Sequence, residues 1–237
     1  LCEDPSVIGS AFYVMDHVEG RIFWDPTLPG MVPGERAAIF NELNRVLAAL
    51  HQVHPASIGL ADYGRPGAYL ERQVARWTRQ YKAAETEPIE AADRLMEWLP
   101  SHIPPEGVTR LVHGDYRIDN VIFHPTEPRI LAVLDWELST LGDPLVDFAY
   151  HCMSWRMPQT SRGLAGVNVV ALGIPSEAHY LARYLSCTGR QSAVPARDWN
   201  YYLVFNMFRL VGILQGIAKR VEAGTASSAQ AKASGDT

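Results

Sequence analysis

Three oxygen-bearing side chains at fixed spacing indicate what this chain could catalyse. Asp115 follows His113 and Gly114, Asn120 comes five residues after Asp115, and Asp135 comes fifteen residues after Asn120. A carboxylate beside a reacting hydroxyl can orient it and accept its proton, while an amide oxygen and a second carboxylate can hold Mg²⁺ against nucleotide phosphates. Brought together, these residues would suit phosphoryl transfer to a hydroxyl group.

The elements around these residues must place them at one point. One apolar run leads into the His-Gly-Asp triplet, and two more cover Val121 to Phe123 and Ile130 to Leu134, with a polar, proline-containing turn between them. Runs of this length bounded by turn signals predict short buried strands. The last two runs should form a hairpin with Asn120 at its start and Asp135 at its end. We therefore expect Asp115, Asn120 and Asp135 to converge at one mouth.

The stretch HGDYRIDN at 113–120, followed by LDWELSTLGDPLVDFAY at 134–150, resembles the aminoglycoside phosphotransferase-like kinases. In that branch of the protein-kinase-like fold, His-Gly-Asp stands where protein kinases have His-Arg-Asp. The stretch is most similar to the subgroup called phosphotransferase family proteins, whose members also occur fused to acyl-CoA dehydrogenases. The resemblance implies an α+β, protein-kinase-like fold that is mainly the helical large lobe with its catalytic hairpin, with ATP and Mg²⁺ as cofactors.

The resemblance also assigns roles to single residues. Asp115 would be the catalytic carboxylate, while Asn120 and Asp135 would bind the metal, Asp135 in the place of the aspartate of the kinase Asp-Phe-Gly motif. Arg117 falls where protein kinases carry a lysine that meets the transferring phosphate, so it is a candidate for the same charge stabilisation. His113 is expected to hold the loop by hydrogen bonds rather than to move protons.

Two of these neighbours have structural alternatives. Arg117 could instead form an ion pair with Asp119 or Glu137. Glu137 could supply a second metal contact or cap its own loop, and capping is the favoured interpretation. Asp143 precedes Pro144 and predicts a helix start, because aspartate accepts orphan amide hydrogens there and proline needs none. The resemblance suggests that this aspartate or the nearby Asp147 also braces the catalytic loop, and both are assigned to structure.

The stretch Ser10 to Val18 is apolar and β-prone, and it resembles the last strand of a kinase small lobe running into the hinge. In the family the hinge backbone hydrogen-bonds the adenine edge, which implicates Asp16 and Val18, with Met15 near the gatekeeper position. An ordinary edge strand is the alternative. No glycine-rich phosphate loop or strand lysine precedes it, and the first lysine is Lys82. We therefore expect a kinase-like fragment with most of its small lobe missing.

The rest of the chain is expected to be mainly helical. Apolar residues at the 3.6-residue period, together with cap residues, predict helices over 34–53, 69–81, 89–99, 176–187 and 198–221. The small and polar residues that follow predict a disordered tail. The expected domains are the last small-lobe strand and hinge at 1–19, the helical large lobe with the catalytic and metal-binding loops at 20–221, and the tail at 222–237.

Composition narrows the functional class. The 237 residues are 47% hydrophobic and 20% charged, which suits one sizeable globular domain. A net charge of -5 without a basic, aromatic-rich run argues against nucleic-acid binding. Three scattered cysteines and no visible leader suit a reducing cytoplasm. The apolar stretch Tyr201 to Ala218 is interrupted by Asn206, Arg209 and Gln215, so a buried helix is expected there rather than a membrane span.

The favoured function is an ATP- and Mg²⁺-dependent kinase that phosphorylates a hydroxyl of a small molecule. The fusion partner of the subgroup points to a hydroxylated acyl compound. The alternative is a catalytically inactive kinase-like fragment that acts as a binding or scaffold module. A metal-dependent hydrolase using Asp115, Asp135 and a histidine is a weaker third hypothesis, because the sequence has no HxH or HExxH cluster.

Overall fold

The computed structural model describes residues 1–224, so most of the predicted tail at 222–237 lies outside the described residues. The fold is α+β and rich in helix. The helices are α1 Pro33–Gln52, α2 Tyr69–Ala84, α3 Glu90–Ser101, α4 Pro144–Cys152, α5 Val169–Leu172, α6 Glu177–Cys187 and α7 Ala196–Glu222. The strands are β1 Arg110–Val112, β2 Val121–Phe123, β3 Ile130–Val133 and β4 Thr140–Gly142.

Helix α1 forms as its sequence predicts. It begins at a proline, whose missing amide hydrogen costs nothing in the first turn of a helix. The Glu35 carboxylate accepts the Val32 amide at 3.0 Å and closes the N-terminal turn. Its buried residues Ile39, Leu43 and Leu47 recur at helical spacing and face α6. The helix predicted over 34–53 is therefore confirmed to within one residue at each end.

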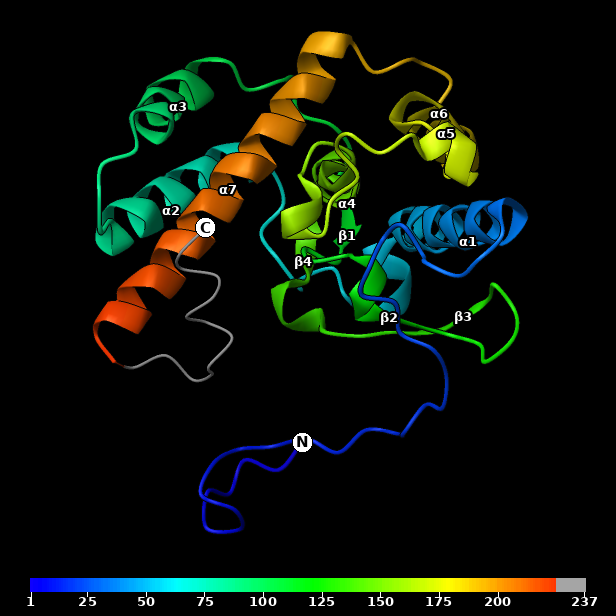
Figure 1. Cartoon of the computed structure of the whole chain (residues 1–237). Coiled ribbons are helices and arrows are strands. Elements are labelled where there is room, and N and C mark those ends of the chain that lie inside the picture. The colour runs from blue at the N-terminus through cyan, green and yellow to red at the C-terminus, as the bar shows by residue number, and fades with distance from the viewer. Residues whose placement is uncertain (225–237) are drawn as a thin grey trace.

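Helix α4 lies at the centre of the core. All nine of its residues are buried, as expected for a helix that is covered on every side. Phe148 stacks on Tyr184 of α6 with ring centroids 3.9 Å apart. On the other side, α4 packs against α7, which runs diagonally across the molecule beside α2 and α3 (Figure 1). A helix held from both sides is a rigid support for the loops that contact it.

The strands form two separate pairs. The predicted hairpin is present, with β2 antiparallel to β3 and Val121 opposite Val133. The second pair joins β1 to β4, with Leu111 opposite Leu141, and it was not predicted. Because β1 leads into the His-Gly-Asp triplet and β4 leads into α4, this pairing ties the two segments together at the site.

The predicted strand at Ser10–Val18 is not formed, which corrects that expectation. Its one ladder contact is the isolated bridge between Cys2 and Phe12. The side chains that follow are mostly exposed: Tyr13 68%, Val14 85% and Met15 67%. A strand needs a neighbour for its amides and carbonyls, and within residues 1–224 no strand pairs with this segment beyond that single bridge. The segment extends away from the helices, and the chain rejoins the rest of the protein at the hairpin, where Arg21 bridges Phe123 of β2 (Figure 1).

Helix α7 contains the predicted apolar stretch. Within residues 1–224 it is the one helix long and apolar enough to cross a membrane by length and composition, and half of its most apolar window is buried inside the protein. Its polar side chains Asn206, Arg209 and Gln215 are buried too. Asn206 Nδ2 donates to the Val146 carbonyl at 2.9 Å, which fastens α7 to α4. Asn206, one of these buried polar residues, therefore serves a contact between helices.

Candidate active site

The His-Gly-Asp loop is held through its main chain by Asp147 of α4. Its two carboxylate oxygens accept the main-chain amides of His113 at 2.7 Å and Gly114 at 2.8 Å. His51 Nε2 lies 3.1 Å from the same carboxylate. Burial opposes ionisation here, but the hydrogen bond and charge of His51 and the two amides outweigh it and hold the pKa of Asp147 below its ordinary value. Asp147 is thus the brace of the loop, while Asp143 caps α4 through the Leu145 amide at 2.9 Å.

Two neighbours of Asp115 fix its backbone. Gly114 has a φ of +85°, and a Cβ atom there would lie 2.6 Å from the Leu138 carbonyl oxygen, so glycine is required. The ring of His113 accepts the Asp115 amide at Nδ1 (3.2 Å), and its Nε2 then donates to the Leu134 carbonyl at 2.8 Å. The prediction that His113 holds the loop by hydrogen bonds is confirmed.

The carboxylate of Asp115 is bonded through both of its oxygens. Asn120 donates its side-chain amide to Asp115 Oδ2 at 2.9 Å and to the Asp115 main-chain carbonyl at 2.8 Å. The Tyr150 hydroxyl donates to Oδ1 at 2.5 Å. The Asp115 side chain keeps 16% of its surface exposed, so a ligand can reach it. The structure therefore brings Asp115 and Asn120 into direct contact, as their spacing predicted.

Arg117 lies over this carboxylate. Its Nε is 3.4 Å from Asp115 Oδ1 and its NH2 is 3.2 Å from Asp119 Oδ2. Burial opposes its charge, but the carboxylates of Asp115, Asp119 and Asp135 raise the pKa of Arg117. The alternative ion pair with Asp119 is thus present, whereas no ion pair with Glu137 forms in the part of the chain that the structure describes. Arg117 is therefore held by two carboxylates, one of which is Asp115.

Asp135 lies at the end of β3, next to Asn120. The Leu134 amide donates to the Asn120 carbonyl at 2.8 Å, which continues the hairpin ladder by one residue toward Asp135. Asp135 has a left-handed backbone, φ 62° and ψ 63°, and an exposed side chain. Glu137, two residues on, makes no hydrogen bond within residues 1–224, so the expected cap is not formed.

The donor chemistry of this corner fits a hard cation. Asn120 Nδ2 donates to Asp115, so the Asn120 amide oxygen Oδ1 is left as an available acceptor. In the described chain the Asp135 carboxylate makes no hydrogen bond, and Asp135 is exposed. Neutral and charged oxygens of this kind suit Mg²⁺ when phosphates supply the remaining ligands. Among residues 1–224, no group of three or more His, Cys, Asp or Glu side chains could hold a metal.

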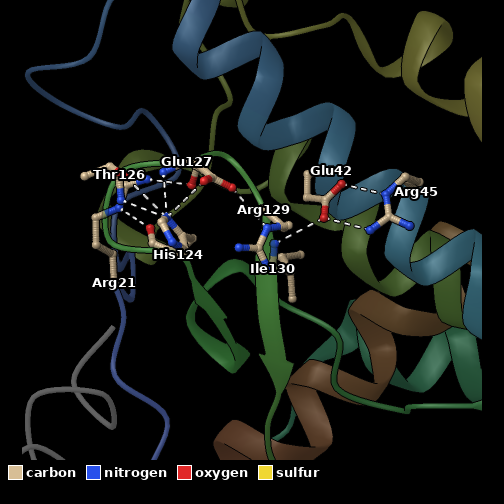
Figure 2. A network of polar contacts seen from close by, with 8 residues as sticks. All are labelled: Arg21, Glu42, Arg45, His124, Thr126, Glu127, Arg129 and Ile130. Atoms are coloured by element: carbon tan, nitrogen blue, oxygen red, sulfur yellow. Dashed lines mark hydrogen bonds and ion pairs between the residues drawn. The ribbon is translucent and has the colours of Figure 1, made fainter.

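The hairpin is anchored along both edges. On one edge, Arg21 exchanges two main-chain hydrogen bonds with Phe123, and its guanidinium donates to the carbonyls of His124 and Glu127 at 2.9 Å each. On the other edge, Glu42 of α1 accepts the Ile130 amide at 3.1 Å (Figure 2). The two metal-ligand candidates at the end of the hairpin therefore sit on a fixed frame.

The structure does not bring the three hinge residues to the catalytic loop. Met15 and Asp16 are exposed and Val18 is partly exposed, all on the extended N-terminal segment. Within the described chain, no main-chain hydrogen bond is made from residue 13 to residue 20. Their role in adenine binding stays a prediction.

A comparison with protein families decides the classification. Residues 1–184 match the model described as the phosphotransferase enzyme family. The chain belongs to this family. A phosphotransferase-family fold supports transfer of phosphate to small molecules, and the scaffold alternative is not favoured.

Relatives of this phosphotransferase-family chain are longer proteins. Acyl-CoA dehydrogenase family member 10 of Mus musculus is 48% identical, with 99% of this chain and 22% of the relative covered. Acyl-CoA dehydrogenase family member 11 of Homo sapiens is 44% identical, with 96% of this chain and 29% of the relative covered. The chain thus spans less than a third of the length of these curated relatives.

Solved structures agree with the family assignment. A crystal structure from Ralstonia eutropha, described as a candidate aminoglycoside phosphotransferase, is 61% identical with a TM-score of 0.91, covering 99% of this chain and 71% of that one. An aminoglycoside-3'-phosphotransferase of type VIII, 17% identical with a TM-score of 0.57, covers 79% of this chain and 66% of that one. At that identity, the second likeness shows the fold alone. The predicted protein-kinase-like fold is confirmed.

Sequence reasoning missed two residues of this phosphotransferase-family site. Tyr150 contacts Asp115, and the buried Arg209 donates to the Gly114 carbonyl at 2.7 Å. A signal existed for each: Tyr150 lies three residues after Asp147, on the same helical face, and a lone arginine in an apolar helix requires a polar partner.

Proposed function

We propose that this chain is the large-lobe part of a kinase that transfers the terminal phosphate of Mg²⁺-bound ATP to a hydroxyl of a small molecule. The observation that supports this proposal most directly is the pair of hydrogen bonds from Asn120 to Asp115. These bonds hold one carboxylate and one side-chain amide in contact. Phosphoryl transfer depends on positioning and charge neutralisation far more than on covalent chemistry by the protein. A pre-formed pair of this kind supports that reaction.

Asp115 would act on the acceptor. Its partly exposed carboxylate accepts the acceptor's hydroxyl hydrogen and points the oxygen at the terminal phosphorus. The new oxygen–phosphorus bond forms while the bond to the bridging oxygen of ADP breaks, and the acceptor proton passes to Asp115. Arg117, 3.4 Å from Asp115, faces the charge that accumulates on the phosphate oxygens during transfer.

Asn120 Oδ1 and the Asp135 carboxylate would hold the magnesium ion. When bound, the ion neutralises phosphate charge and fixes the direction of the triphosphate. The hairpin ladder keeps these two residues adjacent, and the left-handed backbone of Asp135 sets the direction of its side chain. Both residues therefore act by orientation.

The N-terminal segment would bind the adenine edge. Its main chain from residue 13 to residue 20 has donors and acceptors without main-chain partners in the described chain. Those groups, at Asp16 and Val18, are available to a flat heterocycle, with Met15 beside them. This arrangement supports ATP as the donor.

For the acceptor, we propose a hydroxylated acyl compound. The names of the two curated relatives, both acyl-CoA dehydrogenase family members, support this class. The candidate aminoglycoside phosphotransferase from Ralstonia eutropha supports an amino sugar as the competing acceptor. A comparison of both compound classes by ADP release would separate them.

Calorimetric titration of the 237-residue chain with ATP, with and without Mg²⁺, tests the proposal. Binding that requires Mg²⁺ would support a nucleotide site built from the hinge and the hairpin. Equal binding with and without the metal would remove Asn120 and Asp135 from the metal site. A folded chain that binds no nucleotide at all would contradict the function proposed for this chain.

A further inference from the structure

The Tyr150 hydroxyl donates a hydrogen bond to one of the two carboxylate oxygens of Asp115, the proposed catalytic residue. It donates to Asp115 Oδ1 at 2.5 Å, while Asn120 holds Oδ2 at 2.9 Å. A carboxylate bonded through one oxygen can rotate about χ1 and χ2, whereas one bonded through both has a single orientation. Asn120 alone would leave that rotation open, and Arg117 Nε lies 3.4 Å from Oδ1, so the Tyr150 hydroxyl supplies the closer second contact.

The fold buries the Tyr150 side chain and favours the protonated form of its phenol. The side chain is 6% exposed, and burial together with the charge of Asp115 raises the pKa of Tyr150. Its hydroxyl is therefore a hydrogen-bond donor at every working pH. Tyr150 also lies one helical turn after Asp147 on α4, so one rigid face of one helix contacts both the backbone and the side chain of the loop.

Arg209 of α7 backs this contact. Its guanidinium carbon lies 4.7 Å from the ring centroid of Tyr150 and 5.3 Å from that of Trp77 of α2, so the cation interacts with two aromatic rings. The same guanidinium donates to the Gly114 carbonyl at 2.7 Å. Arg209 is 8% exposed, and its Nε has no hydrogen-bond partner in the described chain. Burying a cation with an unsatisfied nitrogen costs free energy of folding. Here that cation holds the loop at Gly114 in place.

We propose that Tyr150, backed by Arg209, is a positioning residue that fixes the side-chain orientation of Asp115 for attack by the acceptor oxygen. This inference rests on the function proposed above. Tyr150 acts through Asp115 and does not itself meet the substrate, since its hydroxyl already donates to the carboxylate.

The test substitutes Tyr150→Phe, which removes the hydroxyl and retains the ring that stacks on Arg209. The matched control is Tyr201→Phe, because Tyr201 is also buried and its hydroxyl donates to the Leu99 carbonyl at 3.0 Å, on a different contact. Basal turnover of Mg²⁺-ATP, with water as the acceptor, is measured by ADP release. Tyr150→Phe should lower kcat by about 10- to 100-fold with KM for ATP unchanged, because orientation is lost while nucleotide contacts stay.

A second measurement does not depend on turnover. Three-bond Hα–Hβ couplings of Asp115, read by NMR, report how many χ1 rotamers the side chain populates. The wild-type chain and Tyr201→Phe should show one rotamer, and Tyr150→Phe should show averaged couplings. A single unchanged rotamer in Tyr150→Phe overturns the proposal. An inactive wild-type chain with a single Asp115 rotamer counts against the proposed function and leaves the Tyr150 contact supported.

If Tyr150→Phe does not fold, 3-fluorotyrosine replaces all ten tyrosines and retains every hydroxyl. Fluorine makes each phenol a stronger donor, and Tyr150 is the one tyrosine bonded to Asp115 within residues 1–224. The proposal expects a changed kcat at constant KM for ATP in the fluorinated chain. An unchanged kcat would refute it.

Discussion

Asn120 bonds Asp115 twice, once at the main-chain carbonyl and once at the carboxylate, at 2.8 and 2.9 Å. One amide group thus sets both the path of the chain and the direction of the reacting side chain. Because the nitrogen is used for this purpose, the amide oxygen of Asn120 is left for the proposed metal site. Asp115, proposed for catalysis, and Asn120, proposed for metal binding, are therefore oriented by the same pair of hydrogen bonds.

Asp115→Asn should abolish turnover and leave nucleotide binding intact. The amide can still accept a hydrogen bond, but it cannot take the acceptor proton, so kcat should fall by about a hundredfold or more. Mg²⁺-ATP affinity, measured by calorimetry, should match that of the wild type. A folded variant that no longer binds the nucleotide would show that Asp115 has another role.

Asp135→Asn should remove the Mg²⁺ dependence of nucleotide affinity. Asparagine tolerates the left-handed backbone at φ 62° better than alanine does, so the change removes charge with little strain. The ratio of ATP affinities with and without Mg²⁺ should drop by about tenfold, as expected when one charged ligand is lost. Glu137→Gln is the matched control, and an equal drop in that variant would argue against Asp135 as a specific ligand.

Val18→Pro tests the adenine contact. Proline removes the amide hydrogen that the hinge prediction assigns to the nucleotide base, whereas Val18→Ala retains it. We expect affinity for ATP to fall by about tenfold in the proline variant alone, the worth of one hydrogen bond. Equal ATP affinities for the two variants, measured by calorimetry, would exclude the Val18 amide from adenine binding.

Gly114→Ala should destabilise the protein beyond the cost of its backbone angle. Gly114 and Gly166 have φ of +85° and +79°, but a Cβ at Gly166 meets nothing within 4 Å, while at Gly114 it meets the Leu138 carbonyl. Gly166→Ala should therefore cost about 1 kcal/mol of unfolding free energy and Gly114→Ala about 2–3 kcal/mol more. Urea denaturation measures both, and equal losses would mean that the loop relaxes around the added methyl group.

His151 predicts a loss of stability on acidification. Burial lowers its pKa to about 4, below the ordinary value of 6.5, so between these values the unfolded chain binds a proton that the folded chain does not. The free energy of unfolding should therefore fall by up to about 1.4 kcal/mol per pH unit as the pH drops from 6.5 toward 4. His151→Gln can still accept the Tyr180 hydroxyl bond and should flatten this slope. Urea titrations at several pH values decide the matter, and parallel slopes would assign the acid sensitivity to other groups. Asp147 adds its own loss only below this window, since its folded pKa lies under its ordinary value.

Local patterns predicted local structure well. Helix α1 and the β2–β3 hairpin follow from apolar spacing and turn residues, which act within a few positions of the chain. The pairing of β1 with β4 escaped prediction because three-residue strands far apart in sequence carry no such period. The strand predicted at Ser10–Val18 was wrong because its pattern specifies a face to bury and cannot supply the neighbour.

The residues of the candidate site likewise fall into those predicted from local spacing and those brought in by tertiary packing. Asp115 and Asn120 could be predicted because their five-residue spacing belongs to one loop. Tyr150 and Arg209 reach that loop from two other helices, and only packing of those helices brings them there. A hydrogen bond between distant segments depends on tertiary geometry, which no residue period encodes.

The bridge between Arg21 and Phe123 links the segment proposed to bind adenine to the hairpin proposed to bind the metal. Arg21 is three residues from Val18, and Phe123 is three residues from Asn120. The main-chain hydrogen bonds between Arg21 and Phe123 therefore connect the proposed adenine contact to the proposed metal contact by a short path. The hairpin is also held on its other edge by Glu42, so we expect a displacement at one of these contacts to affect the other (Figure 2). Under the proposed function, the adenine and the metal-bound triphosphate of one nucleotide would bind cooperatively, and a ligand with either half alone would lose that coupling.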